Sequence, residues 1–252
     1  MTGLSDDARR NREDWTQANA AYTDASASRH WAQEEITWGV FGIPEASLGT
    51  LGEVEDLDVV ELGCGTGRVA IPIARDGLRV TGVDYSAAML DVARARAQAE
   101  GVRIAWVQGD MRDVRLGRTF HTVLVPFGSL QHMATPDEVV QALETVATHL
   151  ARNGYAVVDI EAPHPEDIEP GPRPLVMHWT RPWDGGQVSK LVAVEARPSE
   201  GVREVTFHYD VQPAGGALHR DSHTFTLRVI SAGELELAAR LAGLELVSAY
   251  GD

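Results

Sequence analysis

The chain has 252 residues, of which 44% are hydrophobic and 23% are charged, and its formal net charge is −15. This length and composition predict one globular core, alone or with an added element. The acidic balance is not offset by any long basic run, which disfavours a nucleic-acid partner bound through its phosphates.

Other features of the composition narrow the class of protein further. A single cysteine, Cys64, excludes an internal disulfide bond and a cysteine-rich zinc site. Apolar runs stay shorter than about 18 residues and the polar N-terminus lacks a signal-peptide core, so we expect a cytoplasmic protein with no membrane partner. His208, His219 and His223 lack a recognised ligand spacing, and we expect no metal site.

Residues 58–160 alternate short apolar runs with helical patterns. A capping box at Thr135–Glu138 starts the last of these helices, and Asn153-Gly154 is expected to end it. Alternation of strands and helices is typical of an α/β fold with a doubly wound, mostly parallel sheet. The predicted strands are 59–62, 79–84, 103–108, 119–127 and 155–160, and the other predicted helices are 68–75 and 86–100.

The pattern changes after a proline-rich connection at 163–174. Residues 188–196, 202–211 and 222–230 alternate apolar and polar side chains, as half-buried antiparallel strands do. A second capping box, from Ser231 to Glu234, starts a helix, and 244–250 has the pattern of a last strand. We therefore predict four parts: a helical N-terminal segment (1–57), a core (58–162), an inserted antiparallel sheet (163–230), and a helix and strand that complete the core (231–252).

The most informative segment is 59–67, in which an apolar strand containing Glu61 runs into the glycines Gly63, Gly65 and Gly67. Glycines permit a tight turn and the close approach of a ligand to the main chain. A dinucleotide-binding loop usually has the pattern G-x-G-x-x-G, whereas this loop has G-x-G-x-G after an acid. It resembles motif I of the class I S-adenosylmethionine (SAM) methyltransferases, which have a Rossmann-like fold.

Two other hypotheses remain beside the methyltransferase. A nicotinamide-dependent oxidoreductase is disfavoured because the third glycine comes one residue early and no Tyr-x-x-x-Lys pair is present. A non-catalytic SAM-binding protein is disfavoured because the strand-end residues are intact and a polar segment lies where the methyl group should emerge.

The ends of the later strands supply further cofactor candidates, because ligands of an open α/β sheet bind beyond the carboxyl ends of its strands. Asp84 follows the loop by about 20 residues. This spacing is typical of a carboxylate that accepts hydrogen bonds from the ribose hydroxyls of a bound cofactor. Asp110 can accept a hydrogen bond from the adenine amino group. The predicted cofactor-binding set is Glu61, Gly63, Cys64, Gly65, Gly67, Asp84, Tyr85, Met89, Asp110, Met111, Val125 and Pro126, with Cys64 as a small packing residue.

Segments 109–113 and 127–133 look similar to the amino-sugar N,N-dimethyltransferases. The resemblance implies SAM as cofactor, S-adenosylhomocysteine as product, a small-molecule acceptor, and a histidine near that acceptor, here His132. It also implies that the N-terminal segment is a lid with a tyrosine near the methyl group, here Tyr22. Trp31 and Trp38 are further lid candidates. Residues 31–44 are richer in Trp and Gly than in those enzymes, so the resemblance does not establish a sugar as the substrate.

The resemblance favours an amine nitrogen as acceptor, while an O-methyltransferase or a peptide amine N-methyltransferase on the same fold remains an alternative. His132 has an ordinary pKa near 6.5 and either accepts the amine proton, orients the acceptor or simply packs. Glu161 follows the last parallel strand and either assists the acceptor or is a solvated acid. The inserted sheet is expected over the acceptor site and is a candidate homodimer interface. Its aromatic residues Trp179, Trp183 and Tyr209 either wall the acceptor pocket or pack in the core.

Overall fold

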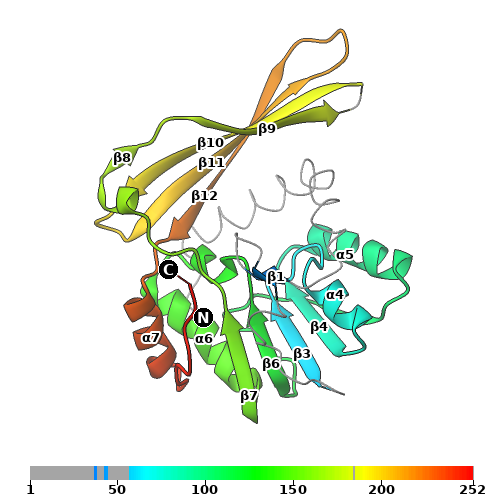
Figure 1. Ribbon diagram of the computed structural model, residues 1–252, viewed down its shortest axis with the longest axis vertical. Coiled ribbons are helices and arrows are strands. Elements are labelled where there is room, and N and C mark those ends of the chain that lie inside the picture. Colours follow the sequence, from blue (N-terminus) through cyan, green and yellow to red (C-terminus); the bar gives the residue numbers. More distant parts are fainter. Residues whose placement is uncertain (1–36, 39–42, 45–56, 184, 252) are drawn as a thin grey trace. The chain divides into compact units, whose positions relative to one another are not determined.

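The computed structural model describes residues 37–38, 43–44, 57–183 and 185–251. Residues 163–229 form one compact unit, and the described residues on either side of them belong to a second (Figure 1). Strands β1 (Thr37–Trp38) and β2 (Ile43–Pro44) pair antiparallel. Tyr22, Trp31 and most of the predicted lid lie outside the described residues.

The second unit is built on a five-stranded parallel sheet with the order β5-β4-β3-β6-β7. The order reverses between β3 and β6, so a ligand site is expected at the carboxyl ends of these neighbouring strands. The predicted doubly wound parallel sheet is confirmed. Its strands are β3 (Asp58–Leu62), β4 (Arg79–Asp84), β5 (Ile104–Gln108), β6 (Phe120–Val125) and β7 (Leu150–Val158); its helices are α4 (Ala70–Arg75), α5 (Ala87–Ala99), η1 (Ser129–His132), α6 (Pro136–His149) and α7 (Ala232–Leu241).

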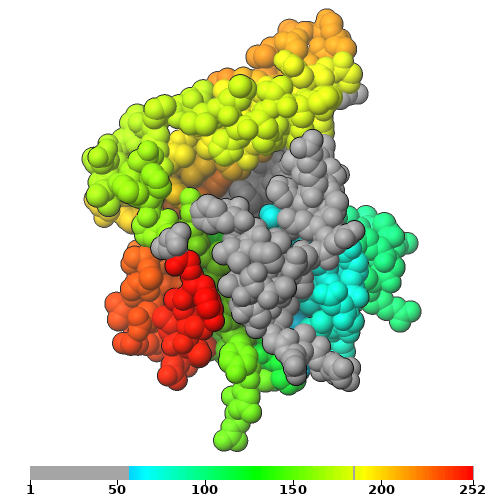
Figure 2. All heavy atoms as spheres, viewed as in Figure 1, coloured from blue at the N-terminus to red at the C-terminus, as the bar shows by residue number. Residues whose placement is uncertain are grey.

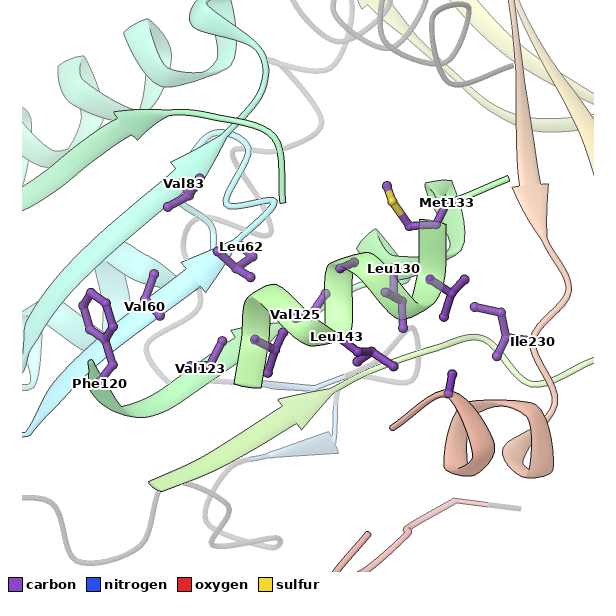
Figure 3. Packing of buried hydrophobic residues seen from close by; sticks show 14 residues of the cluster. Val60, Leu62, Val83, Phe120, Val123, Val125, Leu130, Met133, Leu143 and Ile230 are labelled. Atoms are coloured by element: carbon purple, nitrogen blue, oxygen red, sulfur yellow. The ribbon is translucent and has the colours of Figure 1, made fainter. Parts of the chain in front are cut away.

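Buried side chains alternate between the two faces of this sheet, as the pleat requires. Val60 and Val123 pack on one face with Leu143 of α6 and Ile230, which precedes α7 (Figure 3). Val59 and Leu124, one position away on each strand, pack on the other face with α4. Helices therefore cover both faces of the sheet.

Local capping explains where the helices begin. Ser86 Oγ accepts a hydrogen bond from the Met89 amide at 3.3 Å and starts α5. Thr135 and Glu138 form the predicted capping box at the start of α6. Ser231 Oγ accepts from the Glu234 amide at 3.1 Å and starts α7.

The predicted boundary between α6 and β7 was wrong by several residues. The helix ends at His149 and the strand already begins at Leu150. A Cβ atom at Gly154 would lie 2.7 Å from the His121 carbonyl oxygen, and the β6–β7 register shifts between Phe120 and Thr122. Gly154 therefore marks a bulge inside the strand, where two backbones approach closely, and does not end the helix.

The last strand predicted over 244–250 is also absent from the structure, which has no regular element there. Figure 2 shows these residues in red at the surface beside α7. Val247 is 76% exposed and Tyr250 66% exposed, so the alternating pattern buries little apolar area. A lone segment without that burial does not offset the entropy of ordering a strand.

The other unit is a five-stranded antiparallel sheet in which β12, β11 and β10 follow in order, and β8 and β9 both pair with β10. The register sets Val188 opposite Val211, and both pack with Trp179, Trp183 and Tyr209. This cluster supports the packing interpretation of the three aromatic residues. The elements are η2 (Pro165–Ile168), β8 (Gly171–Pro172), β9 (Val176–Trp183), β10 (Gly186–Arg197), β11 (Val202–Gln212) and β12 (His219–Arg228).

Candidate active site

The glycine loop and the end of β4 are joined by backbone hydrogen bonds. The amides of Gly63 and Cys64 both donate to the Val83 carbonyl, at 2.8 and 3.0 Å. Asp84 accepts from the Gly65 amide at 2.7 Å through Oδ2 and from the Ser86 amide at 2.8 Å through Oδ1. Burial raises the pKa of Asp84 and the two amides oppose that shift. Each carboxylate oxygen keeps a lone pair with which it could accept from a ribose hydroxyl.

The three glycines of the loop serve different purposes. All have positive φ, of +75° at Gly63, +52° at Gly65 and +78° at Gly67. A Cβ atom would lie 2.8 Å from Ser129 Oγ at Gly63 and 2.9 Å from the Trp106 ring at Gly67, but would meet nothing within 4 Å at Gly65. Gly63 and Gly67 therefore permit close packing, whereas no described residue occupies the position of a Cβ atom at Gly65, where a ligand could approach the backbone.

Glu61 lies beneath the loop as a buried carboxylate and is only 2% exposed. Its Oε2 atom has no hydrogen-bond partner among the described residues. Burial raises the pKa of Glu61 well above its ordinary value, and the charge of Asp84 raises it further, while a hydrogen bond from the Ala70 amide and the charge of Arg68 lower it. A bound cation would favour the ionised form of this buried acceptor, and the ammonium group of SAM fits that requirement.

At the adenine end of the predicted site, Asp110 pairs with Arg112, a residue that the sequence did not single out. Arg112 Nε donates to Asp110 Oδ1 at 3.0 Å and Nη2 donates to Oδ2 at 2.6 Å. This two-point geometry fixes the carboxylate plane. The hydrogen bonds to Asp110 raise the pKa of Arg112. The only signal in the sequence was that Arg112 stands two residues after Asp110.

The turn that follows β6 has a backbone conformation unusual for a non-glycine residue. Phe127 has φ of +54° and Gly128 has φ of +67°. Asp159, just beyond β7, accepts from the Phe127 amide at 3.0 Å through Oδ2 and from the Gly128 amide at 3.1 Å through its carbonyl. The Arg68 guanidinium lies 3.9 Å from the centre of the Phe127 ring. These contacts hold the backbone of the segment from Val125 and Pro126 to His132.

His132 and Glu161 lie on segments that Gln131 ties together. Gln131 Oε1 accepts from the Glu161 amide at 2.8 Å, and Nε2 donates to the Glu161 carbonyl at 3.3 Å. The Glu161 side chain itself is exposed. Burial lowers the pKa of His132 from 6.5 to about 4, so its imidazole is neutral at pH 7.

The remaining predicted residues divide between buried and accessible positions. Cys64 is buried and burial raises its pKa, so it is a thiol that packs and not a nucleophile. Met89 is buried, whereas Tyr85 and Met111 are partly exposed. Within the described residues, no group of three or more His, Cys, Asp or Glu side chains could hold a metal ion. None of the helices described combines the length and hydropathy of a membrane span.

Comparison with known proteins identifies the family. A family model described as a methyltransferase domain matches residues 59–154. The dTDP-3-amino-3,6-dideoxy-alpha-D-glucopyranose N,N-dimethyltransferase of Streptomyces fradiae is 33% identical over 190 residues, which cover 75% of this chain and 70% of that protein. The cypemycin N-terminal methyltransferase of a Streptomyces species is 29% identical over 195 residues, 77% of this chain and 74% of that one.

A solved structure, the CcbJ methyltransferase from Streptomyces caelestis, matches with a TM-score of 0.65 and 29% identity over 81% of this chain and 84% of that one. Other relatives match over a shorter stretch: the chain spans 44% of a Geobacillus protein and 46% of a Bacillus subtilis protein. The glycine loop and the long alignment lead to one conclusion. The chain belongs to the class I SAM-dependent methyltransferases, in the small-molecule branch that resembles the amino-sugar N,N-dimethyltransferases.

Proposed function

We propose that this enzyme transfers the methyl group of SAM to an amine nitrogen of a small molecule. The observation that carries the proposal is the position of His132, which ends η1 just beyond the carboxyl end of β6, at the edge of the sheet that also carries the glycine loop and Asp84. A neutral imidazole beyond the end of β6 can accept a hydrogen bond or a proton from an amine. Two of the matched relatives are, by name, an amino-sugar N,N-dimethyltransferase and the cypemycin N-terminal methyltransferase.

When bound, SAM supplies an electrophilic methyl group. The chain's task is then to bind the cofactor and the acceptor and to exclude water. We propose Glu61 for the ammonium group, Asp84 for the ribose hydroxyls and Asp110 for the adenine amino group. Among the described residues, Glu61 Oε2 has no hydrogen-bond partner and no atom lies within 4 Å of an added Cβ at Gly65, and both observations support these roles.

On the acceptor side, we propose His132 as the residue that takes the amine proton or orients the acceptor. An amine must be unprotonated to attack, and it needs less help from a base than a hydroxyl does. The exposed Glu161 would attract a cationic acceptor before that proton leaves. Tyr22 is the proposed lid residue near the methyl group and lies outside the described residues.

A screen with methyl-labelled SAM tests the acceptor class. The acceptors are amino sugars and their nucleotide conjugates, peptides with a free N-terminus, and hydroxylated metabolites without an amine. We expect label on amines, in an amount that falls when His132 is replaced by alanine. Label only on hydroxyl groups would contradict the amine proposal, and label on peptides alone would favour the peptide N-terminal activity.

We further propose a cytoplasmic homodimer that associates through the antiparallel sheet and does not bind nucleic acid. Exposed apolar side chains at the start of the edge strand β9 support the interface: Val176 is 53% exposed and Met177 is 63% exposed. The net charge of −15 disfavours nucleic acid. Light scattering after gel filtration is expected to give the dimer mass for the wild type and the monomer mass for Met177→Glu.

A further inference from the structure

Two loops of the site meet at one buried carboxylate, Glu138, in the first turn of α6. Its side chain and backbone together are only 7% exposed. Oε1 accepts from Arg112 Nη1 at 2.7 Å. Oε2 accepts from the amides of Ala134 at 3.0 Å and Thr135 at 3.2 Å. Each oxygen therefore holds a different loop.

On the cofactor side, the Arg112 guanidinium is shared between two carboxylates. Nε and Nη2 hold Asp110, and Nη1 holds Glu138. The Arg112 side chain is 12% exposed, which limits its freedom to move away from either partner. The Arg112 carbonyl also accepts from Thr145 Oγ1 of α6 at 2.8 Å. The orientation of Asp110 is thus set from α6 through Arg112.

On the acceptor side, the two amides bound by Glu138 come directly after His132 and Met133. Gln131 fixes the other flank of His132 through its bonds to Glu161. The loop that carries His132 is therefore held at both flanks.

A capping box alone does not require this arrangement. A helix cap uses one acidic or amide side chain to accept from the N-cap amide, and Oε2 of Glu138 does this for Thr135. The bond from Oε1 to Arg112 adds nothing to the cap. It connects the cap to the carboxylate proposed for adenine.

We propose that Glu138 is a positioning residue that aligns the adenine-binding carboxylate of Asp110 with the loop that carries His132. This inference rests on the proposed roles of Asp110 and His132. Its consequence is specific: loss of the Glu138–Arg112 bond should weaken recognition of the adenine amino group and spare the rest of the cofactor site.

Glu138→Gln separates the two roles. Glutamine serves in capping boxes as glutamate does, so its side-chain oxygen can still accept hydrogen bonds from the amides of Ala134 and Thr135. Its amino group would then face the Arg112 guanidinium, donor against donor. Thr135→Ala is the matched control, because it removes the cap bond from the Glu138 amide to Thr135 Oγ1 (3.2 Å) and leaves Arg112 untouched. Arg112→Lys is a second test variant, because one ammonium group cannot match the two-point geometry at Asp110 while also reaching Glu138.

The measurement is the Kd, by titration calorimetry, for S-adenosylhomocysteine and for S-inosylhomocysteine, in which an oxo group replaces the adenine amino group. We expect the wild type to prefer the adenine compound by about tenfold or more, the size of one hydrogen bond to a charged group. Glu138→Gln and Arg112→Lys should lose most of that preference by binding the adenine compound about tenfold more weakly. Thr135→Ala should have a lower Tm and keep the preference.

Asp110→Asn distinguishes failure of this inference from failure of the proposed site. If Asp110→Asn loses the preference while Glu138→Gln and Arg112→Lys keep it, Asp110 recognises adenine without the help of Glu138 and the inference is overturned. If Asp110→Asn itself keeps the wild-type preference, the adenine role of Asp110 is wrong, and the positioning role fails with it.

Discussion

The Gly65 amide donates to the Asp84 carboxylate at 2.7 Å, so the glycine loop after β3 and the end of β4 are fixed to one another. The other oxygen of Asp84 accepts from the Ser86 amide at the start of α5. Three segments thus share one carboxylate. A site of this kind is formed before its ligand arrives, which lowers the entropy cost of binding.

Replacement of Asp84 by asparagine should therefore weaken cofactor binding. An amide has one acceptor oxygen where the carboxylate has two, so one of the two backbone amides would face an amino group. We expect the Kd for S-adenosylhomocysteine to rise by about 10- to 100-fold. Asp58→Asn is the control, because Asp58 lies at the opposite end of β3 and pairs with Arg79. Equal affinity of Asp84→Asn and the wild type would refute the ribose assignment.

Gly65→Ala should reduce cofactor binding more than it reduces stability. The residue has positive φ, which strains alanine by about 1 kcal/mol, and an added Cβ would contact none of the described atoms. Gly101→Ala is a matched control, since Gly101 also has positive φ and nothing within 4 Å of an added Cβ, but lies after α5. Both variants should lose similar free energy of unfolding, and only Gly65→Ala should bind S-adenosylhomocysteine poorly. Similar binding losses in both would mean that Gly65 does not border the cofactor.

Glu61→Gln should stabilise the ligand-free protein and weaken its binding of SAM. Glu61 has a buried acceptor oxygen that lacks a hydrogen-bond partner in the part of the chain that the structure describes, and its pKa is raised in the folded state. A raised pKa means that the folded chain holds the proton more tightly, so stability is greatest below pH 4.5 and falls as the pH rises through the folded pKa. We expect a gain of about 1–3 kcal/mol in the free energy of unfolding at pH 7, measured by urea denaturation. A loss of stability at pH 7 together with unchanged binding would contradict this role.

Much of the site around the glycine loop and Asp84 could be predicted from the sequence, because the patterns that predict it lie within short segments of the chain. Gly63 to Gly67 and Asp84 follow strands whose apolar runs are unambiguous, and Ser86 and Thr135 are side-chain caps, which act over three residues. The roles of Arg112, Asp159 and Glu138 Oε1 could not be predicted, because they depend on contacts between residues that are 26 to 32 positions apart in the chain. The start of β7 was misjudged because Gly154 looks like a helix stop and lies instead in a bulge.

His132→Ala should lower kcat by about 100-fold if the imidazole accepts the proton, and should leave the Kd for S-adenosylhomocysteine unchanged. The folded pKa of about 4 means that His132 loses its acceptor nitrogen only as the pH falls through that value. Between pH 5 and 8, kcat/KM should therefore follow the ionisation of the amine. The unfolded chain binds the same proton near pH 6.5, so folding stability should also decline as the pH falls from 6.5 towards 4.

His121→Ala is the control for this experiment, because His121 is an exposed histidine on β6 and its loss should leave the rate unchanged. An acid limb near pH 6.5 that disappears in His132→Ala would mean that His132 titrates normally. Full activity of His132→Ala at every pH would make it a packing residue.

The central claim is that the carboxyl edge of the parallel sheet, with Glu61, Gly65 and Asp84, binds SAM. Titration calorimetry of the whole chain with SAM, S-adenosylhomocysteine and NAD tests it most directly. We predict that SAM and S-adenosylhomocysteine each bind at one site per chain, that they compete, and that NAD gives no binding heat. Binding of NAD without binding of either SAM or S-adenosylhomocysteine would contradict the claim.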